Sequence, residues 1–193
     1  QVLGNYEVIE EIGQGGFAIV YRARHQILHS DHALKVLLPE HVSERHIRDR
    51  FLNEARVIAR LRHPNIIRAT DVIRAPGIAG IVMDFIEGGS LEDWIANAEE
   101  PPTTKFIKHI FVPVLDALHH AHQHNVIHRD LKPANILMQP TPDGGFRPCV
   151  VDFGVARIRG ALRSAHNNDT ITGSQMGTLG YMSPEQIRSA TES

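Results

Sequence analysis

A short polar, glycine-containing stretch, Glu87-Gly88-Gly89-Ser90, divides the chain into two parts with unlike hydrophobic patterns. Before it, most apolar runs are short and contain the β-branched and aromatic residues that are typical of strands. Beyond it, apolar residues recur mainly at spacings of three and four, which indicates helices. We therefore expect a strand-rich part over residues 1–86 and a mainly helical part over residues 87–193.

The strand-rich part begins with a predicted hairpin. Residues 6–12 and 17–24 have strand character, and the cluster Gly13-Gln14-Gly15-Gly16 forms the turn between them. Further strands are predicted at 32–37, 66–73 and 78–85. A helix is predicted from Ser43, which can cap it, to Arg62. Its buried stripe is predicted to contain Ile47, Phe51, Ala55, Ile58 and Leu61.

The second part contains two predicted helices. Ser90 can cap a short helix that runs through Trp94, and Thr103 or Thr104 can cap a long one that reaches about His124. Pro113 lies inside the long helix and predicts a local kink. Short strands are expected on both sides of the turn at 140–145, followed by a long polar loop at 157–180. The buried stripe of the long helix is predicted to contain Ile107, Phe111, Val114, Leu118 and Ala121.

Composition excludes several classes of protein. Twenty Lys and Arg residues against 22 Asp and Glu residues give a net charge of −2, so no general basic surface exists to bind nucleic acid or an anionic membrane. The single cysteine, Cys149, excludes an internal disulfide framework and fits a reducing compartment. The longest apolar run, Ile78 to Ile86, contains Asp84 and is shorter than the roughly 20 residues of a membrane span. We expect a soluble, cytoplasmic chain, although an anchor after Ser193 in a longer parent protein is compatible with this expectation.

Histidine is frequent, with 13 residues, and several lie close together near the end of the long predicted helix. Asp116, His120 and His124 recur every four residues and would share one face of that helix. A metal site is one interpretation. A solvated, histidine-rich helix end is the other, and it is favoured because no cysteine and no evident further ligand completes a tetrahedral site.

The glycine turn is the first candidate site. The pattern Gly13-x-Gly15-x-x-Ala18 between two strands allows a phosphate to approach the backbone without obstruction by Cβ atoms. A plain hairpin turn is the alternative interpretation. A dinucleotide-binding turn is disfavoured because a strand, not a helix, follows the glycines.

Lys35 and Glu54 form the second candidate site. Lys35 lies in an apolar predicted strand, and Glu54 lies on the buried stripe of the predicted helix 43–62. A buried charge is costly unless an opposite charge meets it. Each residue lacks a local partner, so we predict that they pair with each other.

Two further segments concentrate polar groups next to apolar strands. Residues 126–137 contain Asp130, Lys132 and Asn135, and residues 150–154 place Asp152 at the end of an apolar run. Oxygen atoms of Asn135 and Asp152 are hard ligands that suit Mg²⁺, which usually binds one or two protein groups together with phosphate oxygens.

In this order, the motifs resemble the protein kinase family, and the resemblance covers nearly the whole chain. Lys132 and residues 177–185 resemble the serine/threonine branch of the family. The glycine loop and residues 126–137 resemble the corresponding segments of its bacterial members. The motifs that carry the resemblance are the glycine-rich loop, Ala33-Leu34-Lys35, Glu54, His128-Arg129-Asp130 with Asn135, Asp152-Phe153-Gly154 and Ser183-Pro184-Glu185.

The resemblance implies an α+β, two-lobed fold, with a β-rich N-lobe that contains one main helix and a mostly helical C-lobe. It also implies transfer of the ATP γ-phosphoryl group to a Ser or Thr hydroxyl of a protein. By position, Asp130 would orient the acceptor hydroxyl, Lys132 would stabilise the transferred group, and Asn135 and Asp152 would bind Mg²⁺. The residues that would bind ATP are Ile12, Gly13, Gly15, Gly16, Val20, Ala33, Lys35, Glu54, Met83, Asp84 and Ile86.

Some features depart from the family pattern. Ala18 replaces the third glycine of the loop, and Ser183 replaces an alanine, but no catalytic group is missing. Helices that follow the Ser-Pro-Glu motif in the family are absent before Ser193, so we expect an incomplete C-lobe. A catalytically silent nucleotide-binding or scaffolding module is therefore the alternative function.

Regulation by phosphorylation is also expected. Arg129 precedes Asp130, and in the family an arginine there marks kinases whose loop is ordered by a phosphate. Thr170 and Thr172 are the favoured acceptors, ahead of Ser164. Self-association for autophosphorylation is a further expectation.

Overall fold

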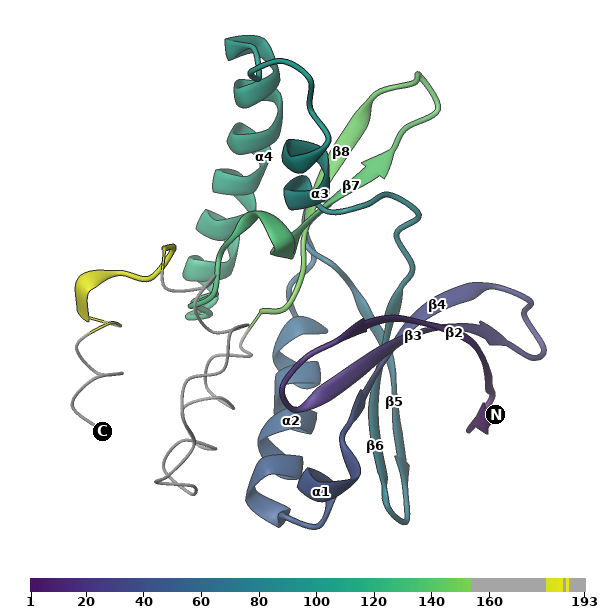
Figure 1. Cartoon of the computed structure of the whole chain (residues 1–193). Coiled ribbons are helices and arrows are strands. Elements are labelled where there is room, and N and C mark those ends of the chain that lie inside the picture. Colours follow the sequence, from purple (N-terminus) through teal and green to yellow (C-terminus); the bar gives the residue numbers. More distant parts are fainter. Residues whose placement is uncertain (154–179, 186, 188–193) are drawn as a thin grey trace.

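The computed structural model describes residues 1–153, 180–185 and 187 of the chain (Figure 1). Its first part is a six-stranded antiparallel sheet in the order β1-β2-β3-β4-β6-β5. The strands are β1 (Val2–Leu3), β2 (Tyr6–Gln14), β3 (Ala18–His25), β4 (Asp31–Leu37), β5 (Ala69–Ala75) and β6 (Ile78–Asp84). The predicted hairpin over the glycine turn is confirmed, as β2 pairs with β3.

Two helices follow β4, namely α1 (Pro39–Val42) and α2 (Arg45–Ile58). The predicted cap is wrong, because Ser43 ends α1 and α2 begins after Glu44, which makes no side-chain cap hydrogen bond. Pro39 accounts for the separate turn, since its fixed φ angle suits the start of a helix. The predicted helix end at Arg62 is wrong, because α2 ends at Ile58 and Leu61 lies in the segment after it. All five residues predicted for the stripe are nevertheless buried, namely Ile47, Phe51, Ala55, Ile58 and Leu61.

The second part contains α3 (Leu91–Ala96), α4 (Thr104–Gln123), the short 3₁₀ helix η1 (Pro133–Asn135) and the hairpin of β7 (Ile136–Pro140) and β8 (Phe146–Val150) (Figure 1). Both predicted caps are present. The Ser90 hydroxyl accepts a hydrogen bond from the Asp93 amide at 3.0 Å, and the Thr103 hydroxyl accepts one from the Phe106 amide at 3.2 Å. These contacts satisfy amide groups that have no partner inside the helix.

The buried face of α4 differs from the prediction. Ile107 and Phe111 are 42% and 44% exposed. The buried residues are Ile110, Val114, Ala117 and Ala121. Both sets have helical spacing, and the packing of α4 against β8 selects the second, in which small alanine side chains allow a close approach. Pro113 lies inside α4 as expected.

The main hydrophobic core continues from one part of the molecule into the other. It includes Phe17 beside the glycine turn, Phe51 of α2, Val114 of α4 and Val150 of β8. A smaller cluster on the other face of the sheet contains Leu34 and Val82. The shared core holds the sheet and the β7–β8 hairpin together, and the candidate site lies where they meet. The boundary predicted at residue 87 stays a prediction.

Candidate active site

The glycine cluster forms the turn between β2 and β3. Gly13 lies opposite Val20, and the Gly15 amide donates a hydrogen bond to the Ala18 carbonyl oxygen at 2.8 Å. A Cβ atom added at Gly13 or Gly16 would meet no atom within 4 Å. Packing inside the protein therefore does not require glycine at these two positions, and the backbone has free space beside it.

The strand register places several predicted pocket residues on one face of the sheet. Val20 lies opposite Lys35, and Ala33 lies opposite Met83. Because cross-strand partners and alternate residues of a strand share a face, these four side chains point to the same side. Ile12 lies at an irregularity of the β2–β3 register and is 46% exposed.

The segment after β6 connects the sheet to the second part. Asp84 and Ile86 are half-buried, and the Asp84 amide donates to the Arg68 carbonyl oxygen at 3.1 Å. Further along, the Met138 amide donates to the Gly89 carbonyl oxygen at 2.9 Å, so β7 holds this connection from the other side. The predicted hydrogen bonds from residues 84–86 to an adenine base stay a prediction.

Lys35 forms an ion pair with Asp152. The distance between Lys35 Nζ and Asp152 Oδ1 is 2.9 Å, and Lys35 is only 5% exposed. The ammonium group also lies 5.5 Å from the centre of the Phe17 ring. The prediction of a buried lysine that needs a carboxylate is confirmed, but this partner was not predicted. The Glu54 side chain lies outside the described residues, so the Lys35–Glu54 pair stays a prediction.

Asp130 is the centre of a network of polar side chains. It is 9% exposed, and its Oδ2 atom lies 3.6 Å from Lys132 Nζ. Asn135 Nδ2 donates to the Asp130 carbonyl oxygen at 2.7 Å and approaches Asp130 Oδ2 at 3.4 Å. Asn135 is itself buried, and these contacts hold it against Asp130.

His128 joins this loop to the strand end that carries Asp152. Its Nε2 atom lies 2.8 Å from the Val151 carbonyl oxygen, and the Asp130 amide donates to its Nδ1 atom at 3.3 Å. Both contacts together require a neutral ring with the proton on Nε2. Burial lowers the pKa of His128 below its ordinary value of 6.5 and so favours that form. The buried Phe153 ring packs edge-on against the imidazole at 4.7 Å.

The backbone conformation is unusual at two positions of this site. Arg129 and Asp152 have φ angles of 66° and 61°, in the left-handed region that residues other than glycine rarely adopt. Such conformations persist only where surrounding contacts impose them, and they are concentrated at functional sites. The first of these turns lies directly before Asp130, and the second lies at Asp152 itself.

Asn65 links the loop after α2 to β8. Its buried side-chain Nδ2 atom donates to the Pro148 carbonyl oxygen at 2.7 Å. Its main-chain carbonyl oxygen accepts a hydrogen bond from the Val150 amide at 2.8 Å. The Ile67 amide then donates to the Val150 carbonyl oxygen at 2.9 Å. The predicted strand at 66–73 therefore begins only at Ala69. No role was predicted for Asn65, although a polar residue directly before two isoleucines was a usable signal.

The histidines of α4 form a cluster without a metal site. Within residues 1–153, 180–185 and 187, no group of three or more His, Cys, Asp or Glu side chains could hold a metal ion. His63 Nε2 instead lies 3.1 Å from Asp116 Oδ2, and the rings of His63 and His120 are 5.4 Å apart. His120 also packs against His124, with ring centres 4.5 Å apart. The cluster connects α4 to the loop after α2.

The predicted phosphorylation sites lie outside the described residues. The expected phosphate acceptors Ser164, Thr170 and Thr172 belong to residues 154–179, which the structure does not describe. Of the Ser183-Pro184-Glu185 motif, all three residues are described, and Glu185 is exposed. No helix in the described part of the chain is long and apolar enough to cross a membrane.

An antiparallel sheet with one main helix, connected by the segment after β6 to a helical part that carries a buried Asp–Asn loop, is the architecture of a protein kinase. Residues 6–193 match the family model of the protein kinase domain, and the chain belongs to this family. It is 39% identical over 186 residues to the serine/threonine-protein kinase PknJ of Mycobacterium tuberculosis, which is 96% of this chain and 30% of PknJ. It is 35% identical over 188 residues to PrkC of Bacillus subtilis, or 97% of this chain and 28% of PrkC.

Solved structures agree with this result. The kinase domain of PknI from Mycobacterium tuberculosis matches with a TM-score of 0.67 and 31% identity, over 80% of this chain and 62% of that one. The apo form of PpkA-294 matches with a TM-score of 0.73 and 28% identity, over 86% and 64% of the two chains. The predicted fold and serine/threonine kinase class are confirmed. The chain spans less than a third of the length of the curated relatives and less than two thirds of these solved domains.

Proposed function

We propose that the full-length protein transfers the γ-phosphoryl group of ATP to serine or threonine hydroxyls of protein substrates. The observation that carries this proposal is the buried carboxylate of Asp130, held by Asn135 and 3.6 Å from the Lys132 ammonium. A carboxylate in this position can accept or orient the proton of an acceptor hydroxyl. Lys132 lies close enough to stabilise negative charge on the transferred group.

The residues present also fit a nucleotide and a divalent cation. Asn135 uses its amide nitrogen in hydrogen bonds to Asp130, which leaves its amide oxygen for a cation. Asp152 could supply a second hard oxygen ligand. The Val151 amide donates to the main-chain carbonyl oxygen of Asn135 at 3.0 Å, so Asp152, the next residue, lies close to Asn135 along the backbone. When bound, Mg²⁺ would neutralise phosphate charge. The open space at Gly13 and Gly16 suits a backbone that covers phosphates.

The partners and the location follow from this reaction. We expect ATP, a Ser- or Thr-containing protein substrate, and a second copy during autophosphorylation as binding partners. Because the reaction consumes ATP, we place the domain in the cytoplasm. We expect no nucleic acid among the partners.

The test is phosphoryl transfer by the full-length protein, measured with radiolabelled ATP, Mg²⁺ and a panel of acceptor proteins. Phosphate should appear on Ser and Thr, and Asp130→Asn should reduce the rate by at least about 100-fold because its amide cannot accept the proton. Nucleotide binding should remain in this variant. Binding of ATP without transfer by the unmodified protein would instead support a silent nucleotide-binding module.

A further inference from the structure

Three histidines and one aspartate meet where α4 packs against the loop after α2. The His63 Nε2 atom of the loop lies 3.1 Å from Asp116 Oδ2, and the His63 side chain is only 10% exposed. The ring centre of His120 is 5.4 Å from that of His63 and 4.5 Å from that of His124. We call these four side chains the histidine contact. It gathers three groups that can gain a positive charge around a single carboxylate.

The hydrogen bonds of His63 require a neutral ring. Its Nδ1 atom accepts a hydrogen bond from the Asn65 amide at 3.1 Å, so the proton of the neutral ring lies on Nε2 and is donated to Asp116. A second proton would have to occupy Nδ1, where it would break the hydrogen bond from Asn65. Proton uptake by His63 would therefore loosen the loop at Asn65.

The surroundings of His120 also favour a neutral ring. Its Nε2 atom is buried, and no hydrogen-bond partner for it is present in the described part of the chain. A proton added there would place a charged N–H group in a buried position without an acceptor. Burial, followed by the neighbouring His124 and His63, lowers the pKa of His120 below its ordinary value of 6.5. Asp116 opposes this effect, and His119 of α4 adds to it.

The charge of the histidine contact changes sign on acidification. With neutral rings the contact carries only the negative charge of Asp116, and one imidazolium would balance that charge. Further imidazolium groups would leave a surplus of positive charge at ring separations of about 5 Å. Like charges at such distances near a protein surface repel each other strongly. The contact therefore holds one proton easily and a second or third only at the expense of its packing.

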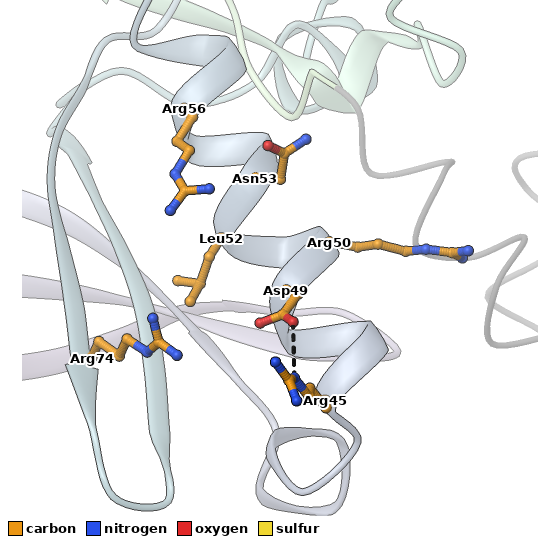
Figure 2. Close-up of a pocket in the computed structure, with 7 residues that line it drawn as sticks. All are labelled: Arg45, Asp49, Arg50, Leu52, Asn53, Arg56 and Arg74. Carbon is orange, nitrogen blue, oxygen red and sulfur yellow. Dashed lines mark ion pairs between the residues drawn. The ribbon is translucent and has the colours of Figure 1, made fainter.

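The charged concavity between α2 and β5 has a different chemistry (Figure 2). Among the described residues, those that line it include four arginines and one aspartate but no histidine. Histidine is the side chain that ordinarily changes its charge between about pH 5 and 8. The concavity should therefore keep its charge over this range, and Arg56, one of its arginines, offers a control.

We propose that the histidine contact is a pH-sensitive link between the two parts of the molecule, closed while its rings are neutral and opened when more than one of them is protonated. Opening would reach the candidate site through Asn65, which holds Pro148 and Val150 of β8 by hydrogen bonds. β8 ends at Val150, two residues before Asp152. This inference goes beyond the proposed function, because the link would respond to pH whether or not the protein transfers phosphate.

Hydrogen–deuterium exchange of the full-length protein, followed by mass spectrometry of peptides that contain residues 59–67 and 146–150, tests this proposal. Protection is compared at about pH 7.5 and about pH 5.5, after correction for the pH dependence of intrinsic exchange, so that the ordinary histidine pKa lies between the two conditions. In the wild type we expect the lower pH to reduce protection of both peptides by at least about tenfold, because repulsion between charges about 5 Å apart exceeds that factor. Added salt should make this loss smaller.

His120→Phe keeps an aromatic ring without a titrating group, so its loss of protection should be less than about threefold. Asp116→Asn keeps an acceptor oxygen for His63 but removes the balancing negative charge, so it should lose protection at a higher pH than the wild type. The controls are His122→Phe, at an exposed position of α4, and Arg56→Ala, and both should match the wild type. His128 is unchanged in every variant, so its titration cannot account for a difference between them.

Thermal melting at about pH 7.5 shows which variants are folded. Equal losses of protection in the wild type and in folded His120→Phe would overturn the proposal. An unchanged pH dependence in Asp116→Asn would overturn it as well, and this variant decides the matter if His120→Phe does not fold. The measurement involves no phosphoryl transfer, so its failure is distinct from a failure of the kinase assignment.

Discussion

Lys35 and Asp152 form a 2.9 Å ion pair that joins the middle of β4 to the segment after β8. Lys35 is buried, whereas the Asp152 side chain is 36% exposed, so the pair has one desolvated end and one end that other groups can reach. A partly exposed carboxylate next to a buried ammonium suits the cation-binding role that we propose for Asp152.

Lys35→Met should reduce phosphoryl transfer by about 100-fold or more, as expected when one positioned donor to a developing charge is removed. The side chain of methionine fills the same buried space without the charge, so the fold should remain. Transfer rate and nucleotide affinity, measured in the full-length protein, check this outcome. Lys105→Met changes an exposed lysine of α4 and should have no effect. Turnover like that of the wild type in Lys35→Met would contradict the assignment of Lys35.

Gly88→Ala should destabilise the connection between the two parts of the molecule. A Cβ atom at Gly88 would overlap the carbonyl group of Met138, so the backbone of β7 or of residues 87–89 would have to move. Overpacking of this kind costs about 1–3 kcal/mol. Chemical denaturation of the full-length protein measures it. Gly16→Ala is the matched control for stability, because its Cβ would meet no atom within 4 Å. Equal stability of the two variants would refute the close approach at Gly88.

Asn65→Ala should reduce stability without removing any catalytic group. It leaves the buried Pro148 carbonyl oxygen without the 2.7 Å hydrogen bond from Asn65 Nδ2, and an unsatisfied buried acceptor costs about 1–3 kcal/mol. The free energy of unfolding in urea measures the loss. Asn53→Ala, at an exposed position of α2, should change it by less than about 0.5 kcal/mol. Because Asn65 also aligns β8, we expect a lower transfer rate in Asn65→Ala.

Stability should decrease on acidification because of His128. Burial lowers the pKa of this group in the folded protein below the ordinary value of 6.5, so the unfolded chain takes up the proton first as the pH falls. The contribution to stability is complete above pH 6.5 and is lost between pH 6.5 and the lower pKa of the folded state. Protonation at Nδ1 would also break the hydrogen bond from the Asp130 amide.

The free energy of unfolding, measured from pH 8 to pH 5 in the wild type and in His128→Asn, checks this prediction. The variant should be less stable at pH 8, and its stability should depend less on pH. His122→Asn replaces an exposed histidine of α4 and serves as the control for the substitution. If the free energy of unfolding falls with pH in the same way in His128→Asn and in the wild type, a group other than His128 causes the loss of stability and the prediction is wrong.

Local patterns were sufficient for much of the fold. The stripe of α2, the caps at Ser90 and Thr103, and the hairpin over the glycine turn depend on neighbours a few residues apart, and each was predicted correctly. The family assignment also came from the sequence, because the order of the motifs is more specific than any one of them. Sequence alone therefore determined the class of protein and most of its elements.

Contacts between distant residues were decided only by the tertiary structure. Lys35 pairs with Asp152, 117 residues away, and no local pattern shows which carboxylate reaches a buried lysine. On α4, two helical stripes were equally regular, and packing against β8 left Phe111 exposed and buried Ala117. The left-handed turns at Arg129 and Asp152 are likewise imposed by surrounding contacts. The physical reason is common to all three cases: spacing along the chain determines which side chains share a face, but only the folded chain determines which surface that face meets.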